Sequence, residues 1–330
     1  MTSVSSKAGA LQVTAERAHA DARGRREVVP LDITILAGGP GVEREVSLQS
    51  GRAVYDALLR LGHRAMLCDI RPDDHSALER QADFVFIALH GEFGEDGTVQ
   101  GLLDHRGLAY SGCGAAASRL AMNKVDTKRR LQQAGLDTPA YEVVHGDNVE
   151  AVAANFKLPA IIKPVALGSS VDMTIVRSEG DLRRALADVV ERYGEALVER
   201  YVDGVELTVG ILGDEAMPVC EIQTNREFYD YQAKYVDDDT RYLFDIELPA
   251  DLLRSVQDQS VVAHRALGCD VLSRVDWMVD RATLTPFVLE VNTIPGFTSH
   301  SLVPKAAERM GLTFEDLCQR IIELSLDKTN

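Results

Sequence analysis

Two short β-patterns near the C-terminus contain three oxygen-bearing side chains and one arginine. The first pattern contains Arg274 and Asp276, the second contains Glu290 and Asn292, and the turn-forming segment DRATLTP separates them. Because residues two apart share one face of a strand, a hairpin would gather all four side chains on one surface. Two carboxylates and an amide oxygen are ligands that Mg²⁺ prefers, so the pattern favours a magnesium site that meets substrate phosphates. A solvated strand face is the alternative explanation of such an alternation.

A second set of residues is suited to binding phosphate. Lys163 precedes the small-residue segment Gly168-Ser169-Ser170, whose backbone N–H groups and hydroxyls could close over phosphates, although such a segment can also be a plain turn. The chain contains no Gly-Lys pair, which excludes a Walker P-loop. Arg44 stands where the third glycine of a dinucleotide fingerprint belongs, which argues against a nicotinamide oxidoreductase.

The elements that must position these residues follow from hydrophobic patterning. The apolar runs DITILA, RAMLCDI and DFVFIALH, with a helical pattern after the first, predict an open, largely parallel α/β unit up to about residue 112. AAASRLAMNKVDTKRRLQQAG reads as one helix that ends at Gly135, and SEGDLRRALADVVERYG as a helix capped by Ser178. LPAIIKPVALGSSVDMTIV predicts two strands that flank the Gly/Ser loop, and ALVERYVDGVELTVGIL predicts paired strands around a turn.

Composition limits the class of protein. The 330 residues are 45% hydrophobic and 26% charged, which is ordinary for a globular chain of two or three domains, and no apolar run could span a bilayer. The net charge of −16 argues against nucleic-acid and anionic-membrane partners. Five scattered cysteines without metal-ligand spacing indicate a reducing, cytoplasmic location. Residues 1–30, rich in Ala, Ser and Arg, are predicted to be a disordered extension.

Taken together, blocks along the chain resemble the ATP-grasp ligases, and within them the D-alanine–D-alanine ligases, from about residue 32 to residue 326. The blocks are GGPGVEREVSLQSG, LHGEFGEDGTVQGLL, AMNKVDTKRRL, IIKPVALGSSVDM, VERYVDGVELTVGIL, FYDYQAKY, SRVDWM and LEVNTIPGFTSHSLVP. The resemblance implies an α/β, three-domain ATP-grasp fold with ATP held between two sheets. Its expected parts are an N-terminal unit at 31–112, a central unit at 113–198 and a C-terminal unit at 199–330.

The resemblance also implies the reaction. One D-alanine carboxylate attacks the γ-phosphate of ATP to give an acyl phosphate, and the amine of a second D-alanine displaces the phosphate. Two Mg²⁺ (or Mn²⁺) ions would be held by Asp276, Glu290 and Asn292. A homodimer that assembles through the N-terminal unit is also implied, as is a role in peptidoglycan precursor synthesis.

Further positions match site residues of the family. Those implied for ATP are Lys124, Lys163, Ser169, Ser170, Glu199, Val202, Glu206, Phe228, Lys234, Met278 and Leu289. Those implied for the amino acids and the chemistry are Glu43, His90, Ser169, Tyr235, Arg274, Gly296, Ser301 and Leu302. Tyr235 favours an amine over a hydroxyl as the second nucleophile, because relatives that form an ester lack this tyrosine. Without the resemblance, Glu43 is a helix-start carboxylate, His90 a buried structural histidine, and Phe228, Met278 and Leu289 plain core residues.

Two departures from the family pattern keep alternatives open. Asp172 occupies a position where the family has glycine, next to the phosphate loop, where a carboxylate would repel triphosphate and a positive φ would suit glycine better. After Tyr242 the chain reads LFDIEL instead of the usual proline-alanine pair. These changes leave two other hypotheses: a sibling ligase that joins another D-amino acid in specialised peptide synthesis, and a weakly active or non-catalytic nucleotide-binding homologue.

Overall fold

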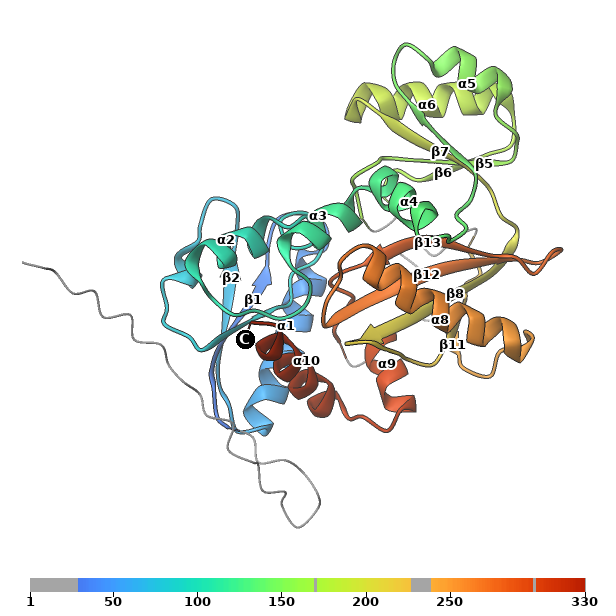
Figure 1. The fold of residues 1–330 in the computed structure, drawn as a ribbon. Coiled ribbons are helices and arrows are strands. Elements are labelled where there is room, and N and C mark those ends of the chain that lie inside the picture. Colours follow the sequence, from blue (N-terminus) through green and yellow to red (C-terminus); the bar gives the residue numbers. More distant parts are fainter. Residues whose placement is uncertain (1–28, 169–170, 227–238, 299–300, 330) are drawn as a thin grey trace, which may run out of the picture.

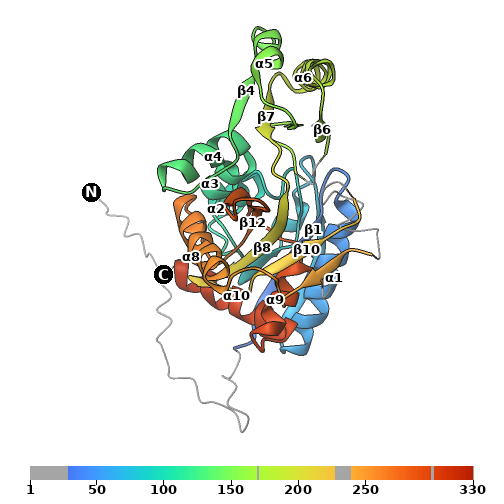
Figure 2. The same ribbon diagram turned by 90° about the vertical axis from the view of Figure 1, so that its right-hand side faces the viewer.

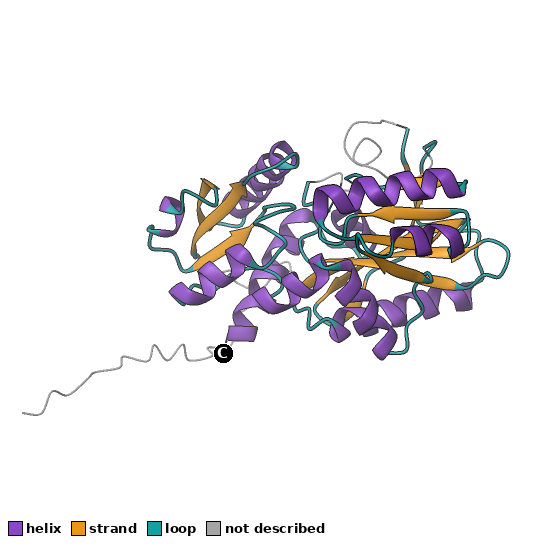
Figure 3. Cartoon of the chain, turned by 90° about the horizontal axis from the view of Figure 1, so that it is seen from above, coloured by secondary structure: helices purple, strands orange, loops and turns teal. Residues whose placement is uncertain are grey.

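Three separate β-sheets organise the chain in a computed structural model that describes residues 29–168, 171–226, 239–298 and 301–329. The predicted extension at 1–30 lies almost wholly outside these residues. The strand orders are β2-β1-β3, β4-β7-β5-β6 and β11-β10-β8-β12-β13, with β9 paired to β8. Seen from above, the strands fall into groups that have helices beside them (Figure 3). The fold is therefore the mixed α/β arrangement that the sequence predicts.

The N-terminal sheet is parallel, as its apolar runs predict. Strand β1 pairs in parallel with both neighbours, and the short connections place helices beside the sheet. Its elements are β1 (Asp32–Gly38), α1 (Arg44–Arg60), β2 (Arg64–Ile70), the 3₁₀ turn η1 (Ser76–Leu78), β3 (Phe84–Ile87) and α2 (Thr98–Arg106).

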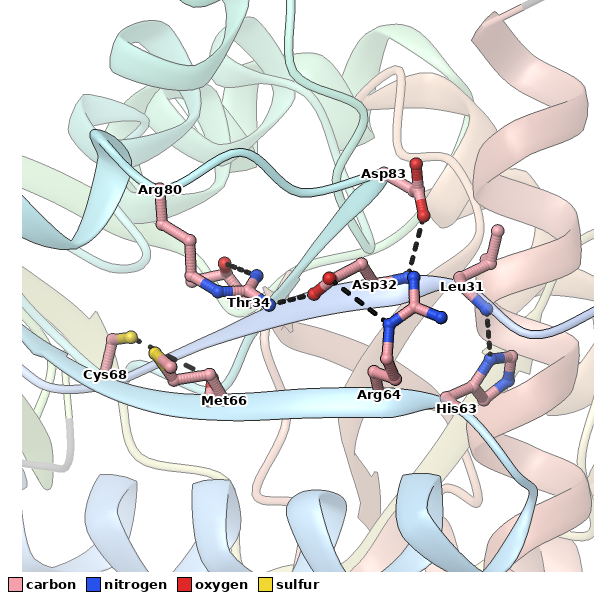
Figure 4. Close-up of polar contacts among 9 residues, drawn as sticks. All are labelled: Leu31, Asp32, Thr34, His63, Arg64, Met66, Cys68, Arg80 and Asp83. Carbon is pink, nitrogen blue, oxygen red and sulfur yellow. Dashed lines mark hydrogen bonds and ion pairs between the residues drawn. The ribbon is translucent and has the colours of Figure 1, made fainter.

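Polar contacts hold the start of this sheet together, as Figure 4 shows. The Asp32 carboxylate accepts from Arg80 and forms an ion pair with Arg64, its partner in the β1–β2 register. The backbone N–H of Asp32 donates to the Asp83 carboxylate at 2.8 Å, and that of Leu31 to Nδ1 of His63 at 3.1 Å. These contacts fix the end of the sheet opposite to the loop that carries Glu43.

The four-stranded sheet forms the upper right lobe of Figure 1, covered on one side by two helices. Val144, Ile162, Val198 and Leu186 belong to the apolar core between the sheet and these helices. The elements are β4 (Tyr141–Val144), α5 (Val149–Asn155), β5 (Ala160–Lys163), β6 (Thr174–Val176), α6 (Glu179–Tyr193) and β7 (Ala196–Arg200). The predicted pair of strands around the Gly/Ser loop is confirmed as β5 and β6, which pair antiparallel. Ser178 caps α6 as predicted, since its hydroxyl accepts from the N–H of Asp181.

The helix predicted before Gly135 is two helices, α3 (Ala115–Met122) and α4 (Lys124–Gln133). Asn123 separates them with an extended backbone, and its side chain accepts from the N–H of Asp126 at 3.0 Å. The prediction of one helix was wrong because Asn123 acts as a new N-cap, a role that favours asparagine. The break turns α4 into the space between the four-stranded sheet and β13 (Figure 1).

The largest sheet carries the predicted C-terminal hairpin. Its elements are β8 (Gly204–Leu212), β9 (Glu215–Ala216), β10 (Cys220–Gln223), β11 (Arg241–Leu243), α8 (Ala250–Ala266), β12 (Leu272–Asp280) and β13 (Pro286–Asn292). Helix α8 packs along this sheet, as Figure 2 shows, and Val256 and Ala263 share a core with Val209 and Trp277. The prediction that 196–212 forms one strand pair was wrong, because β7 and β8 belong to different sheets.

The last two helices return the chain to the N-terminal unit. Helices α9 (Leu302–Arg309) and α10 (Phe314–Thr329) follow the hairpin, and α10 packs against α1 (Figure 1). Leu317 and Ile321 share a hydrophobic core with Ile33 and Leu58. One apolar core thus joins the first and last segments of the chain and fixes the large sheet relative to the N-terminal sheet.

Candidate active site

The hairpin places its polar residues on one face, as the alternation predicts. Strands β12 and β13 are antiparallel, with Arg274 opposite Asn292 and Asp276 opposite Glu290. The register shifts directly after Asp276, so this bulge closes the polar run before Trp277. The four side chains therefore come from directly paired positions, where neighbouring side chains are close.

Arg274 and Asp276 form a buried ion pair. Nε and Nη2 of Arg274 donate to the two carboxylate oxygens of Asp276 at 2.8 and 2.7 Å, and both residues are 7% exposed. Thr208 on β8 also donates to Asp276, at 2.6 Å. This bidentate geometry holds the guanidinium and the carboxylate in fixed positions.

Two cavities meet at this hairpin. The smaller encloses about 410 Å³ and the larger about 910 Å³. Leu289 and Glu290 line both cavities, while Arg274 lines the smaller and Asp276 the larger. The buried ion pair thus lies at the border, and a ligand in either cavity can reach the Glu290 carboxylate.

The larger cavity lies between the four-stranded and the large sheet. The predicted nucleotide residues that line it are Lys163, Glu199, Val202, Glu206, Met278 and Leu289. Two of the predicted metal ligands, Asp276 and Glu290, line it as well. Glu206 and Met278 are paired across β8 and β12, so they face the cavity together. Its walls combine apolar side chains such as Ile161, Val202 and Met278 with many charged groups of both signs.

Glu199 lies between two lysines. It is 1% exposed, its Oε2 is 2.5 Å from Nζ of Lys163, and its Oε1 forms an ion pair with Lys128 on α4. Burial alone would raise the pKa of the Glu199 carboxyl, but the two ammonium groups together lower the pKa to about 2. The side chain is therefore an anion that holds Lys163, and the sequence motif for an adenine contact did not predict this pairing.

The smaller cavity gathers the residues predicted to bind amino acids. Its lining includes Glu43, His90, Lys124, Arg274, Asn292, Gly296, Ser301 and Leu302. Glu43 is the residue before α1, as its sequence position indicates, but its carboxylate makes no capping hydrogen bond. A side chain at Gly91, where φ is +67°, would collide with that carboxylate, so the close approach of Gly91 shapes this wall.

His90 is held from both sides. Its Nε2 lies 3.1 Å from the Ser50 hydroxyl and its Nδ1 3.7 Å from the Glu95 carboxylate. Ser50 and Glu95 were not singled out from the sequence, and the LHGEFGEDG block offered Glu95 only as one of several acidic residues. The histidine is buried, as the structural alternative requires, and it lines the cavity, as the functional one requires.

The second-substrate residues lie at the start of α9. Ser301 is the N-cap, and its hydroxyl lies 3.1 Å from the N–H of Thr298 and 2.9 Å from the Thr298 hydroxyl. Gly296 approaches this hydroxyl, since a Cβ at Gly296 would lie 3.0 Å from it. The N-terminus of a helix that faces a cavity favours a carboxylate there.

Lys124 is the first residue of α4 and lines the smaller cavity, while Lys163 lines the larger one. The ammonium of Lys124 donates to the carbonyl of Leu167, just before the Gly/Ser segment. The two lysines predicted for phosphates thus approach the border of the cavities from different sides. Five further predicted residues lie outside the described residues: Ser169, Ser170, Phe228, Lys234 and Tyr235.

Asp172 adopts the conformation that glycine favours but does not face the cavities. Its φ is +55°, as the sequence argument expects of this position, and it lines neither cavity. Its carboxylate accepts from Arg192, at 2.5 Å, and from the Tyr193 hydroxyl, both at the end of α6. Hydrogen bonds from these two residues lower the pKa of the Asp172 carboxyl. The carboxylate is therefore turned away from the position where it was expected to repel triphosphate.

The second departure, LFDIEL, is largely a packing segment. Phe244 packs with the core that holds α9 and α10, and Ile246 and Leu248 pack with the core under α8. Arg309 also stacks its guanidinium on the Phe244 ring, 4.8 Å from the centroid. Only Tyr242, before this segment, reaches the smaller cavity.

The predicted metal ligands are hard oxygen donors, which are the donor type that Mg²⁺ prefers. Asp276 and Glu290 are direct cross-strand partners, and the Asn292 side-chain oxygen accepts a hydrogen bond from the N–H of Ile294 at 2.9 Å. Hard oxygen donors at the border of a nucleotide-sized cavity match a metal that bridges phosphates. Within the described ranges no group of three or more His, Cys, Asp or Glu could hold a metal, so the set of Asp276, Glu290 and Asn292 stays a prediction.

Comparison with known proteins gives matches over most of the chain. Two family models match the chain, "D-ala D-ala ligase C-terminus" at residues 131–323 and "D-ala D-ala ligase N-terminus" at residues 70–113. A D-alanine–D-alanine ligase of Geotalea uraniireducens (strain Rf4) is 44% identical over 292 residues, which cover 88% of this chain and 94% of the relative.

Solved structures give the same picture. The D-alanine–D-alanine ligase of Bacillus anthracis complexed with ATP matches with a TM-score of 0.77 and 32% identity, over 91% of this chain and 98% of that one. The VanG D-Ala:D-Ser ligase of Enterococcus faecalis matches with a TM-score of 0.79 and 29% identity, over 90% and 100%.

Proposed function

Because the chain belongs to the D-alanine–D-alanine ligase family, we propose that it joins two D-alanine molecules to D-alanyl-D-alanine in an ATP-dependent reaction. It is a peptide-bond-forming ligase. Its product is a precursor for peptidoglycan synthesis and thus serves cell-wall biogenesis and the maintenance of cell shape. The observation that carries the proposal is the meeting of the two cavities at Leu289 and Glu290. A nucleotide in the larger cavity and an amino acid in the smaller one would bring a γ-phosphate and a carboxylate together at that border.

In the first step, the carboxylate of one D-alanine attacks the γ-phosphate, and ADP leaves. The Glu43 carboxylate would hold the ammonium of this D-alanine, since it lines the smaller cavity. Lys163 and Lys124 would hold phosphates from the two sides of the border. Phosphoryl transfer depends mainly on such positioning and charge neutralisation.

In the second step, the amine of the second D-alanine attacks the acyl phosphate, and inorganic phosphate leaves. Arg274, fixed by its bidentate pair with Asp276, and the backbone N–H of Gly296 would stabilise the oxyanion. Ser301 and the N–H of Leu302 would hold the carboxylate of the second substrate, and His90 lies in the same cavity. Ser169 and Tyr235 remain predicted partners of Glu43.

Two Mg²⁺ or Mn²⁺ ions are part of the proposal, with Asp276, Glu290 and Asn292 as protein ligands. When bound, they would neutralise the charge on the β- and γ-phosphates. The protein's own contribution is to hold these donors in register across the hairpin.

Release of phosphate from ATP tests the proposal. Purified protein with ATP, Mg²⁺ and millimolar D-alanine is expected to release phosphate, with little release when D-alanine is omitted. Absence of D-alanine-dependent turnover would reject the assignment. A sibling specificity is the second candidate, favoured by the likeness to a D-Ala:D-Ser ligase. A panel with D-serine and D-lactate in place of the second D-alanine decides between them.

The setting of the enzyme is also proposed. All five cysteines are free, which fits a reducing cytoplasm. No helix in the described part of the chain is long and apolar enough to cross a membrane. A homodimer through the N-terminal unit is proposed from the family likeness. Sedimentation of the purified protein tests it.

A further inference from the structure

A buried lysine that lines neither cavity lies behind the wall of the larger one, where the nucleotide is proposed to bind. Lys128 is fully buried on α4, one helical turn after Lys124, and lines neither cavity. Its ammonium forms an ion pair with Glu199 and donates to the Thr138 hydroxyl. The Tyr141 ring lies beneath it, with the centroid 5.3 Å from Nζ. A lysine is almost never fully buried unless it is paired.

Sheet register explains why these charges converge. Glu199 on β7 is opposite Tyr141 on β4 and Ile161 on β5, and Lys163 is opposite Leu197. These residues therefore share the sheet face toward α4. The Glu199 carboxylate divides its two oxygens between Lys128 behind it and Lys163, which borders the larger cavity.

The charges decide what this arrangement does. Alone, Glu199 would neutralise Lys163, and this pair would offer no net positive charge to a nucleotide in the larger cavity. With Lys128 protonated, the three groups carry a net charge of +1. Burial lowers the pKa of the Lys128 ammonium, and the adjacent Glu199 carboxylate opposes this shift. We infer that Lys128 is a positioning residue that compensates Glu199, so that Lys163 keeps its charge for the phosphates of the bound nucleotide. This inference rests on the proposed ATP site.

The test compares two ligands that share the nucleoside but differ in phosphates. Dissociation constants of ATP and adenosine are measured by calorimetry on the full-length protein. Lys128→Met is expected to lower the preference for ATP over adenosine by about tenfold, the order of effect of one charge acting at short range through protein. A purely structural role would weaken both ligands together and leave the ratio unchanged.

Two further variants sharpen the result. Arg129→Met removes a charge from the next residue of the same helix, where the side chain is 62% exposed, and should leave the ratio as in the wild type. Lys128→Met/Glu199→Gln removes the ion pair but restores the net charge of +1, so its ratio should return to within about threefold of the wild type. Any change that Glu199→Gln makes in contacts with the nucleoside affects ATP and adenosine alike and cancels in the ratio of their dissociation constants.

Each outcome decides something. An unchanged ratio in Lys128→Met overturns the inference. If that variant does not fold, the double variant alone decides the question. A preference for ATP over adenosine tenfold above that of the wild type would mean that Lys128 does not compensate Glu199. A preference tenfold below would mean that the role of Lys128 is not its charge, and either result overturns the inference. A wild-type protein that binds no ATP refutes the proposed function instead.

Discussion

Replacing Arg274 by methionine separates the structural from the chemical role of the hairpin. The change removes two hydrogen bonds to Asp276, at 2.8 and 2.7 Å, from a carboxylate that is 7% exposed and that also accepts from the Thr208 hydroxyl. Breaking a buried ion pair by removing one partner typically costs about 3–5 kcal/mol. We expect Arg274→Met to lower the free energy of unfolding of the apo protein by that amount.

The chain carries its own reporter for this measurement. Trp277, the single tryptophan, is fully buried next to Asp276, and its indole N–H donates to the Ser260 hydroxyl at 2.9 Å. Urea unfolding followed by tryptophan fluorescence therefore monitors the large sheet itself.

A matched control and a double variant complete the design. Arg265→Met breaks an exposed pair with Asp214 at 2.8 Å, and its urea midpoint should stay close to that of the wild type. Arg274→Met/Asp276→Asn should be more stable than Arg274→Met alone, because it also removes the buried carboxylate charge that the Arg274 guanidinium balances. Coincident midpoints for wild type and Arg274→Met would refute the reasoning, as would a double variant less stable than the single one.

Three further predictions follow from other parts of the structure. Burial lowers the pKa of His264 to about 4, below its ordinary value of 6.5, so the folded state disfavours the protonated ring. Between pH 6.5 and pH 4 the unfolded state therefore binds a proton that the folded state does not. The free energy of unfolding is highest above pH 6.5 and falls by about 3 kcal/mol as the pH falls toward 4. His264→Gln should flatten this part of the urea midpoint–pH curve, and an unchanged slope would contradict the assignment. Gly91→Ala would push a Cβ into the Glu43 carboxylate, so the KM for D-alanine should rise at least about tenfold. Gly146→Ala, which meets nothing within 4 Å, is its control, and equal KM values would disprove the contact. Asp172→Gly should change the KM for ATP by less than about threefold, because the carboxylate faces α6; a tenfold gain in ATP affinity would instead support a weakly active homologue.

Patterns of short range predicted the fold well where one element follows the next. Alternation of Arg274 with Asp276 and of Glu290 with Asn292 predicted a hairpin with these side chains on one face, and the register confirms it. The Gly/Ser loop between two strands is confirmed in the same way, since β5 and β6 pair directly.

Sequence patterns failed where the chain leaves one sheet for another. The prediction that β7 and β8 pair was wrong, because Arg200 and Tyr201 donate their N–H groups to Ala140 and Pro159, in segments distant in sequence. No local signal encodes such partners. Asn123 was a visible N-cap signal with Asp126 three residues later, but it lay inside a continuous helical pattern.

Motif residues predicted the candidate site, and the residues that the sequence did not single out are those that contact and position the motif residues. Lys128 lies in the AMNKVDTKRRL block, yet nothing in its spacing distinguishes it from an exposed helix lysine. Lys128 is buried because α4 packs on strands β4 and β7, where it contacts Glu199 and Tyr141, and only the fold determines this packing. Ser50 and Glu95, which hold His90, were missed for the same reason.

The boundaries at residues 112 and 198 remain predictions. The N-terminal sheet lies before residue 112 and the other two sheets lie after it, but residue 198 lies within strand β7 of the four-stranded sheet. The core that α10 shares with β1 also joins the first expected unit to the last. Limited proteolysis of the full chain would locate the segments that separate them.

The most direct test of the account follows an oxygen atom. If a D-alanine carboxylate attacks the γ-phosphate where the two cavities meet, one carboxylate oxygen must leave with the phosphate. D-alanine labelled with ¹⁸O in its carboxylate should therefore transfer one labelled oxygen to each inorganic phosphate, visible by ³¹P NMR. Unlabelled phosphate, released at the same rate, would mean that water attacks ATP and that the joined cavities do not perform the proposed reaction.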